Sequence, residues 1–208
     1  MSEDHYFTAR PASADERRLI SVTLAGEPLE LETAAGVFSP GHVDLGTQVL
    51  LRTVPAPRGR VLDLGCGWGP IALTAALSGA DAVVAVDVNE RALDLLRRNA
   101  ARVAARRPLA PLVACLPIEV AAEASFDTLW SNPPIRIGKE ALHALLDAWL
   151  PRLAPRGEAF LVVQRNLGAD SLAKWLAARG EENGGWGAVE KLGSAKGFRV
   201  LRVEAAQG

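Results

Sequence analysis

The sequence predicts an α/β protein with a doubly wound, mainly parallel sheet and a β-hairpin extension at its N-terminus. Two observations carry this prediction. From residue 60 onward, short apolar runs alternate with amphipathic stretches, as strands alternate with helices in a sheet covered on both faces. Before residue 58, two stretches alternate apolar and polar residues around a turn, which is the pattern of a hairpin. The 208 residues are enough for one domain of this kind.

The N-terminal part, residues 1–57, is expected to pack on the core that follows it. Alternating residues predict hairpin strands at 20–24 and 29–32. A loop then leads to Asp44, which is placed to cap a short helix. This extension and the core, residues 58–208, are expected to form one structural domain.

The periodicity of the core predicts its elements in order. Short apolar runs predict strands at 61–64, 82–86, 112–115, 126–130, 159–163, 188–192 and 198–203. Amphipathic spacing predicts helices at 71–78, 90–105, 139–150 and 171–179. Gly79 and Gly180 stand where the C-terminal caps of the first and last of these helices belong. Ligands of such sheets bind at the carboxyl ends of the strands, so the loops there are the candidates for function.

Composition narrows the classes of function. A net charge of -1 excludes binding of nucleic acid by bulk positive charge, although a local basic patch stays compatible with it. Two cysteines cannot form a disulfide framework or a four-ligand zinc site, and the three histidines are scattered, so no metal is expected. No apolar run approaches the roughly 18 residues that span a bilayer, and the acidic N-terminus does not resemble a signal peptide. We expect a reduced, cytoplasmic protein without membrane contact.

The most informative stretch is the loop after the first core strand, Asp63-Leu64-Gly65-Cys66-Gly67-Trp68-Gly69-Pro70. Glycines at the end of a strand let the backbone approach a ligand closely. A dinucleotide fingerprint has a different glycine spacing, and Pro70 occupies the place of its last glycine. Pro70 suits the first turn of a helix instead. A nicotinamide-dependent oxidoreductase is therefore disfavoured.

Asp87 ends the second core strand. A carboxylate at this point can accept hydrogen bonds from both hydroxyl groups of a ribose. The other interpretation is a cap on the next helix, but Asn89 is better placed for that role. The glycine loop and Asp87 together suit a ligand that has a ribose and no pyrophosphate, and S-adenosylmethionine (SAM) fits this description.

A second motif, Ser131-Asn132-Pro133-Pro134-Ile135-Arg136-Ile137-Gly138-Lys139, follows the fourth core strand. Two prolines end the strand and stiffen the turn. The Asn132 side chain and the Pro133 carbonyl then offer two acceptors at one point. Two acceptors that hold the hydrogens of a planar NH2 group would turn its lone pair toward a sulfonium methyl, without any histidine or carboxylate. Such a turn can also be purely structural; after a SAM-type loop we interpret it as catalytic.

These motifs resemble the class I SAM-dependent methyltransferases, and most closely the small MTS family, which includes 16S rRNA guanine-N2 methyltransferases of the RsmC type. The resemblance extends to Asp4-His5-Tyr6-Phe7, Gly36-Val37-Phe38-Ser39, Val43-Asp44-Leu45-Gly46-Thr47 and Lys196-Gly197-Phe198-Arg199-Val200. It implies a Rossmann-like sheet of seven strands, the last of them antiparallel and paired in a final hairpin.

The resemblance also implies roles for individual residues. Cofactor contacts are expected at Asp63, Gly65, Cys66, Gly67, Gly69, Asp87, Val88, Cys115 and Leu116, with Asp44 and Thr47 close to the cofactor. Catalytic roles are expected for Asn132, Pro133, Pro134 and Ile135, the last at a position where many family members carry an aromatic residue. Substrate contacts are expected for Phe38, near the target, and for Arg136 and Lys139, at phosphates.

The favoured function is SAM-dependent methylation of an exocyclic amino nitrogen of RNA. Guanine N2 of 16S rRNA, in free rRNA or in the assembled subunit, is the favoured target. The same chemistry would serve adenine N6, a protein glutamine amide or a small molecule, and these alternatives stay open. A SAM- or RNA-binding protein without catalysis is a further class, against which the intact Asn132-Pro133-Pro134 turn argues.

Overall fold

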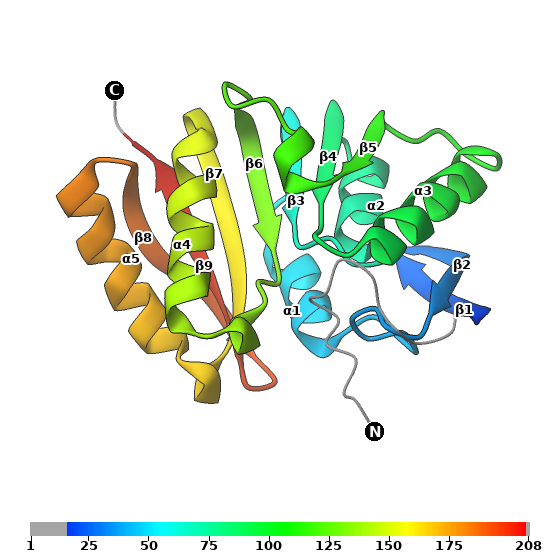
Figure 1. The fold of residues 1–208 in the computed structure, drawn as a ribbon, viewed down its shortest axis with the longest axis horizontal. Coiled ribbons are helices and arrows are strands. Elements are labelled where there is room, and N and C mark those ends of the chain that lie inside the picture. Colours follow the sequence, from blue (N-terminus) through cyan, green and yellow to red (C-terminus); the bar gives the residue numbers. More distant parts are fainter. Residues whose placement is uncertain (1–15, 207–208) are drawn as a thin grey trace.

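A seven-stranded sheet forms the centre of the protein (Figure 1). The computed structural model describes residues 16–206, so the motif at residues 4–7 lies outside the described residues. The strands are β3 (Arg60–Leu64), β4 (Ala82–Val86), β5 (Leu112–Cys115), β6 (Phe126–Ser131), β7 (Leu153–Gln164), β8 (Trp186–Ala195) and β9 (Phe198–Ala205). Their order in the sheet is β5-β4-β3-β6-β7-β9-β8. Strands β3 to β7 pair in parallel, whereas β9 runs antiparallel to β7 and to β8. The predicted doubly wound sheet of seven strands with one antiparallel strand is confirmed.

Helices cover both faces of this sheet. One face carries α1 (Leu45–Thr53), α2 (Pro70–Leu77) and α3 (Glu90–Ala104). The other carries α4 (Lys139–Trp149) and α5 (Ala169–Asn183). Helices α1, α3, α4 and α5 each bury an apolar stripe, and Leu50, Leu96 and Leu146 are fully buried examples. The amphipathic spacing predicted for α2 is wrong, because this helix is buried on all sides from Pro70 to Ala76. Within residues 16–206, no helix has the length and apolar character that crossing a membrane requires.

The N-terminal extension is the predicted hairpin, formed by β1 (Arg17–Leu24) and β2 (Glu27–Ala34). Ala25 and Gly26 form its two-residue turn with φ of 51° and 78°, which matches the twist of paired strands. Asn99 of α3 ties the hairpin to the core. Its Oδ1 accepts from Glu32 N at 2.7 Å, and its Nδ2 donates to Glu32 O at 3.0 Å and to Trp68 O at 3.1 Å. One buried amide therefore joins the hairpin to the glycine loop.

Two glycines predicted as helix caps have different outcomes. Gly79 follows α2 with φ of 101°, as predicted. The prediction for Gly180 is wrong, because α5 continues to Asn183 and Gly184, with φ of 62°, ends it. Gly180 is buried inside the helix, where an added Cβ would come within 2.8 Å of the Trp186 ring. Close helix–strand packing explains this glycine. Strands β7 and β8 are also longer than the apolar runs that predicted them, because exposed residues such as Pro155 and Arg156 of β7 interrupt the apolar pattern within the strands.

The two glycines that flank α2 yield a matched stability test. Gly69 caps the start of α2 with φ of 105°, and an added Cβ would collide with the Leu96 side chain. Gly79 has a similar φ of 101° and nothing within 4 Å of the added Cβ. We expect Gly69→Ala to lower the free energy of unfolding by about 1–3 kcal/mol more than Gly79→Ala does, since overpacking adds to backbone strain. Urea unfolding measures both variants; equal losses would contradict the packing role of Gly69.

Candidate active site

A cavity of about 490 Å³ lies at the carboxyl ends of the central strands. This is where ligands bind in open α/β sheets. Eleven of the predicted site residues line it: Phe38, Asp44, Gly65, Gly67, Asp87, Val88, Asn132, Pro133, Pro134, Ile135 and Arg136. The structure therefore brings together the glycine loop after β3, the acidic residue after β4 and the Asn-Pro-Pro turn after β6.

The glycine loop is held against β4 by backbone bonds. Gly65 N and Cys66 N both donate to Val86 O, at 2.9 and 3.0 Å. Gly65 and Gly67 have φ of 82° and 53°, a conformation that side chains rarely allow. An added Cβ at either position would meet nothing within 4 Å, so the loop leaves open space on its cavity side. This arrangement forms a backbone cradle for a ligand.

Asp87 stabilises the loop and keeps lone pairs for a ligand. Its Oδ2 accepts from Gly67 N at 2.8 Å and its Oδ1 from Asn89 N at 2.9 Å. Burial raises the pKa of the Asp87 carboxyl, against the backbone bonds that lower it. Asn89 caps α3, as the sequence predicts, by accepting from Arg91 N and Ala92 N. Asp87 is therefore not the helix cap, and its two oxygens can still accept from ribose hydroxyls.

Asn89 has a second contact that sequence reasoning missed. Its Nδ2 donates to Gly36 O at 2.8 Å, in the loop that follows the hairpin. Phe38 and Ser39 of the same loop line the cavity. Trp68 is buried, and its Nε1 donates to Ser39 O at 3.2 Å. The loop after the hairpin is thus held over the cavity from both α3 and the glycine loop.

Asp63 lies beneath the glycine loop and is fully buried. Its Oδ2 accepts from Ala72 N at 2.9 Å, whereas its Oδ1 has no hydrogen-bond partner among the described residues. Burial raises the pKa of this carboxyl well above its ordinary value, and the nearby Asp87 raises it further, while the bond from Ala72 opposes both effects. A buried acceptor without a donor costs about 1–3 kcal/mol, so Asp63 carries an electrostatic cost in this loop.

The Asn132 side chain is held in one orientation. Its Nδ2 donates to Asp44 Oδ2 at 2.9 Å and to Thr47 Oγ1 at 3.1 Å. Its Oδ1 accepts no hydrogen bond from any residue that the structure describes, and Asn132 lines the cavity. One residue earlier, the Ser131 hydroxyl donates to Leu64 O at 2.6 Å and joins the ends of β6 and β3. The amide oxygen is therefore an acceptor on the cavity wall, beside the glycine loop.

The Pro-Pro turn fixes the next carbonyl. Ile135 N donates to Pro133 O at 2.8 Å, and Pro134 between them has φ of -73° and ψ of 75°. This is the geometry of an inverse γ-turn. One lone pair of the Pro133 carbonyl is engaged in the turn, and the second is left for another donor.

Several predicted residues lie elsewhere. Thr47 and Cys66 line a small hollow of about 30 Å³ that adjoins the cavity at Asn132. Asp63, Gly69, Cys115, Leu116 and Lys139 do not line the cavity. Gly69 packs against Leu96, and Lys139 begins α4 on the surface. For these residues the predicted contacts stay predictions.

The cavity also has a wall that sequence reasoning missed. Val162 and Gln164 of β7 and Leu145 of α4 line it, together with Phe198, which the sequence places only in a family-like motif. Gln164 follows the apolar run of β7 directly. The rule that selects Asp87 and Asn132, a polar residue at the carboxyl end of a parallel strand, would also have selected Gln164.

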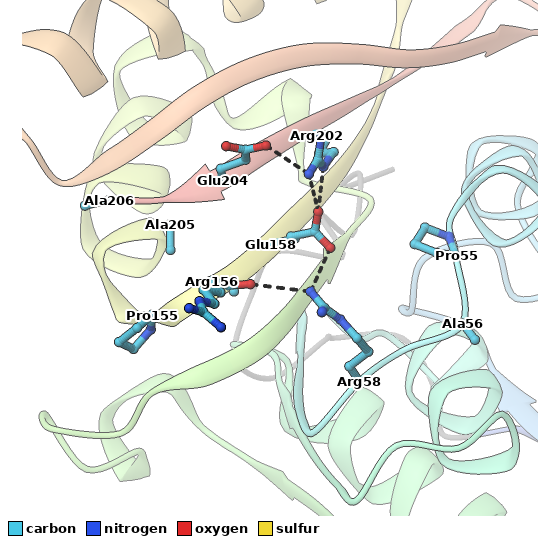
Figure 2. Close-up of a pocket in the computed structure, with 11 residues that line it drawn as sticks. Pro55, Ala56, Arg58, Pro155, Arg156, Glu158, Arg202, Glu204, Ala205 and Ala206 are labelled. Carbon is cyan, nitrogen blue, oxygen red and sulfur yellow. Dashed lines mark hydrogen bonds and ion pairs between the residues drawn. The ribbon is translucent and has the colours of Figure 1, made fainter. Parts of the chain in front are cut away.

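A second, larger cavity of about 800 Å³ lies near the opposite ends of the strands (Figure 2). It contains none of the predicted site residues. Arg202 contacts Glu158 at 2.6 Å, Glu204 at 2.9 Å and Glu190 at 3.0 Å, and Arg58 contacts Glu158 at 3.0 Å. These charges largely satisfy one another, so we place the candidate active site at the carboxyl ends.

Comparison with known proteins shows the family to which the chain belongs. A family model described as the methyltransferase small domain matches residues 28–202. The uncharacterized protein YbxB of Bacillus subtilis (strain 168) is 30% identical over 207 residues, which cover 98% of this chain and 99% of that protein. The chain belongs to the methyltransferase small domain family. The resemblance stated from the sequence is thereby confirmed.

Two further relatives are named as methyltransferases of ribosomal RNA. Ribosomal RNA small subunit methyltransferase C of Stutzerimonas stutzeri (strain A1501) is 30% identical over 192 residues, which cover 89% of this chain and 54% of that protein. The structure of a T. thermophilus 16S rRNA N2 G1207 methyltransferase in complex with AdoMet and guanosine matches with a TM-score of 0.73 and 30% identity, over 94% of this chain and 52% of that chain. The chain spans about half the length of these two relatives. The class I methyltransferase fold is confirmed.

The pKa of Asp63 generates a test of the loop. The pKa of Asp63 in the folded state lies above its value of about 3.9 in the unfolded state. Protonated Asp63 therefore contributes its full stabilising effect below the unfolded-state pKa. This effect is lost as pH rises through the folded-state pKa. Asp63→Asn removes this titration. We expect the wild type to lose stability relative to Asp63→Asn as pH rises above the unfolded-state pKa of about 3.9. Unfolding titrations at several pH values measure this, with exposed Asp81→Asn as the control. A difference that does not vary with pH would contradict the burial of an ionisable Asp63.

Proposed function

We propose that this chain is an N-methyltransferase that uses SAM to methylate an exocyclic amino nitrogen of RNA, with guanine N2 of 16S rRNA as its target. The observation that carries the proposal is the Asn132 amide. Its nitrogen is held by Asp44 and Thr47, so its oxygen is left as an acceptor on the wall of the cavity that also contains the glycine loop. A ribosomal RNA target implies action in the cytoplasm.

The residues present fit SAM as the cofactor. Gly65 and Gly67 leave room for a ligand at the backbone, and Asp87 retains acceptor capacity for ribose hydroxyls. Val88, which is 46% exposed at the cavity, offers apolar surface to an adenine ring. When bound, SAM supplies an electrophilic methyl group on a sulfonium.

The contribution of the Asn132 turn is positioning. An exocyclic amino group has a delocalised lone pair and is a poor nucleophile. The Asn132 Oδ1 and the Pro133 carbonyl would each accept one of its hydrogens and hold the lone pair toward the reacting methyl. Preorganised dipoles of this kind stabilise the charge that develops on the nitrogen without a general base. Arg136 at the cavity and Lys139 at the start of α4 are exposed and could pair with phosphates of the RNA.

RNA as the substrate is supported by two relatives, both of them small-subunit rRNA methyltransferases. The direct test is transfer of a tritiated methyl group from SAM to total RNA, to 30S subunits and to protein, followed by nucleoside analysis. N2-methylguanosine in 16S rRNA is the expected product. A labelled protein, or label in another nucleoside, would contradict guanine N2 of 16S rRNA as the target. Binding of SAM without any methyl transfer would favour a non-catalytic protein.

Asp87→Ala tests the cofactor site. We expect the affinity for SAM to fall by roughly 1–3 kcal/mol, because the ribose hydroxyls lose a charged acceptor. Isothermal titration calorimetry measures this affinity. Asp81→Ala, at an exposed position just before β4, is the matched control and should bind as the wild type does. Wild-type affinity in a folded Asp87→Ala protein would contradict the ribose assignment.

Asn132→Ala tests the positioning of the amino group. We expect kcat to fall by about 100-fold or more, with little change in SAM affinity, because the lost acceptor acts at the reacting nitrogen. Single-turnover transfer with saturating SAM and RNA measures the chemical step. Transfer at the wild-type rate would exclude this mechanism.

An exchange of side chains sharpens that test. Asn132→Asp alone would set a carboxylate against Asp44 Oδ2, where the present donor lies at 2.9 Å, so it should be no more active than Asn132→Ala. Asp44→Asn in the same protein should not repair this contact, because Oδ2 of Asp44 also accepts from Gly46 N and Thr47 N and an oxygen is needed there to cap α1. The double variant should therefore be no more active than Asn132→Asp. Wild-type activity in Asn132→Asp would show that the Asp44–Asn132 contact does not orient the turn.

A further inference from the structure

The strand order divides the cavity into two parts. Gly65, Gly67 and Asp87 lie at the ends of β3 and β4, whereas Gln164 and Phe198 lie at the ends of β7 and β9. In the order β4-β3-β6-β7-β9, β6 and its Asn-Pro-Pro turn come between the two parts. A group held by Asn132 would therefore have the cofactor residues on one side and the β7–β9 wall on the other. The rest of the methyl acceptor belongs against that wall.

Gln164 and Phe198 form a pair on this wall. They are direct partners in the antiparallel register of β7 and β9, so their side chains lie on the same face of the sheet. Both line the cavity, with Val162 beside them. The Phe198 ring also packs on the start of α1, where an added Cβ on Gly46 would lie 2.9 Å from Phe198 Cε1. A fixed aromatic ring thus stands next to a side-chain amide.

The side-chain amide of Gln164 has no hydrogen-bond partner among the described residues, 16–206, although the residue is half-buried. The two carboxylates of the cavity differ in this respect. Asp44 accepts from Gly46 N, Thr47 N and Asn132, and Asp87 accepts from Gly67 N and Asn89 N. A half-buried amide with one donor and one acceptor face suits a ligand that presents the complementary pair.

We infer that Gln164 reads the Watson–Crick edge of the acceptor base, which packs against Phe198. This inference rests on the proposed function and specifies its base. In guanine the N1–H donor lies next to the 2-amino group, and the O6 acceptor follows. Gln164 can accept from N1–H and donate to O6 while Asn132 holds the 2-amino group. In adenine the 6-amino group is followed by N1, an acceptor, and then by a C–H. Adenine therefore offers Gln164 one hydrogen bond, and guanine offers two.

Equilibrium binding to the full chain, saturated with S-adenosylhomocysteine, tests this inference. The probes are guanosine 5′-monophosphate and the 5′-monophosphate of 2-aminopurine riboside, which keeps the 2-amino group but lacks the N1 hydrogen and O6. We expect the wild type to bind the guanine nucleotide roughly 10-fold to 100-fold more tightly, the range for one bidentate contact. Gln164→Leu should reduce this ratio to near 1 by weakening the guanine nucleotide. Gln164→Glu retains the acceptor for N1–H but loses the donor, and should give an intermediate ratio.

Two other variants distinguish recognition of the base edge by Gln164 from stacking on Phe198 and from a general loss of folded protein. Phe198→Leu should weaken both nucleotides to a similar extent and leave their ratio unchanged. Asn183→Leu replaces an exposed amide at the end of α5, remote from the cavity, and should retain the wild-type affinities. Equal affinities in the wild type, or a ratio that survives Gln164→Leu, would overturn the role of Gln164. A preserved ratio without methyl transfer to any RNA would instead overturn the proposed catalysis while leaving base recognition in place.

Discussion

One carboxylate oxygen, Asp44 Oδ2, holds the two halves of the candidate active site together. It accepts from Gly46 N at 2.8 Å and Thr47 N at 3.2 Å at the start of α1, and from Asn132 Nδ2 at 2.9 Å after β6. The first two bonds satisfy the free N–H groups of a helix end. The third determines which atom of the Asn132 amide is left for a ligand. A common helix cap thereby acquires a positioning role, and Asn132 depends on a segment that precedes the core in sequence.

The N-terminal extension contributes to the same site through α3. Asn99 binds both backbone groups of Glu32 in the hairpin and the carbonyl of Trp68 in the glycine loop. Asn89 caps α3 and binds Gly36 O, next to the cavity-lining Phe38. Amide side chains serve here because each supplies a donor and an acceptor and can satisfy two backbone segments at once. Two basic residues in this region are also engaged within the fold, since Arg97 of α3 donates to Ala114 O and Arg107, which follows α3, pairs with Glu27.

The sheet and the two loop motifs could be predicted because they depend on local chemistry. Alternating apolar runs specify strands, and glycine spacing with Pro70 specifies the loop after β3. Gly180 could not be predicted, because its reason is the Trp186 ring, which a distant segment brings against it. The sequence places Asp44 near the cofactor but does not reveal its contact with Asn132, which lies 88 positions further along the chain. Tertiary contacts of this kind leave no periodic signal in the sequence. Gln164, which sequence reasoning missed, is a different case, because a general rule selects polar residues at the carboxyl end of a parallel strand and Gln164 ends β7.

The charges around the cavity favour catalysis by position over catalysis by proton transfer. Within the described part of the chain no histidine lines the cavity, and both of its carboxylates, Asp44 and Asp87, already accept backbone hydrogen bonds. Asp63 is buried beneath the loop and does not reach the cavity wall. An exocyclic amine needs no base before it reacts, because its lone pair has only to be turned out of conjugation. The nitrogen becomes acidic once alkylated and can release its proton to water. A rigid pair of carbonyl acceptors, one from Asn132 and one from Pro133, therefore matches the requirement of the proposed reaction more closely than a titrating side chain would.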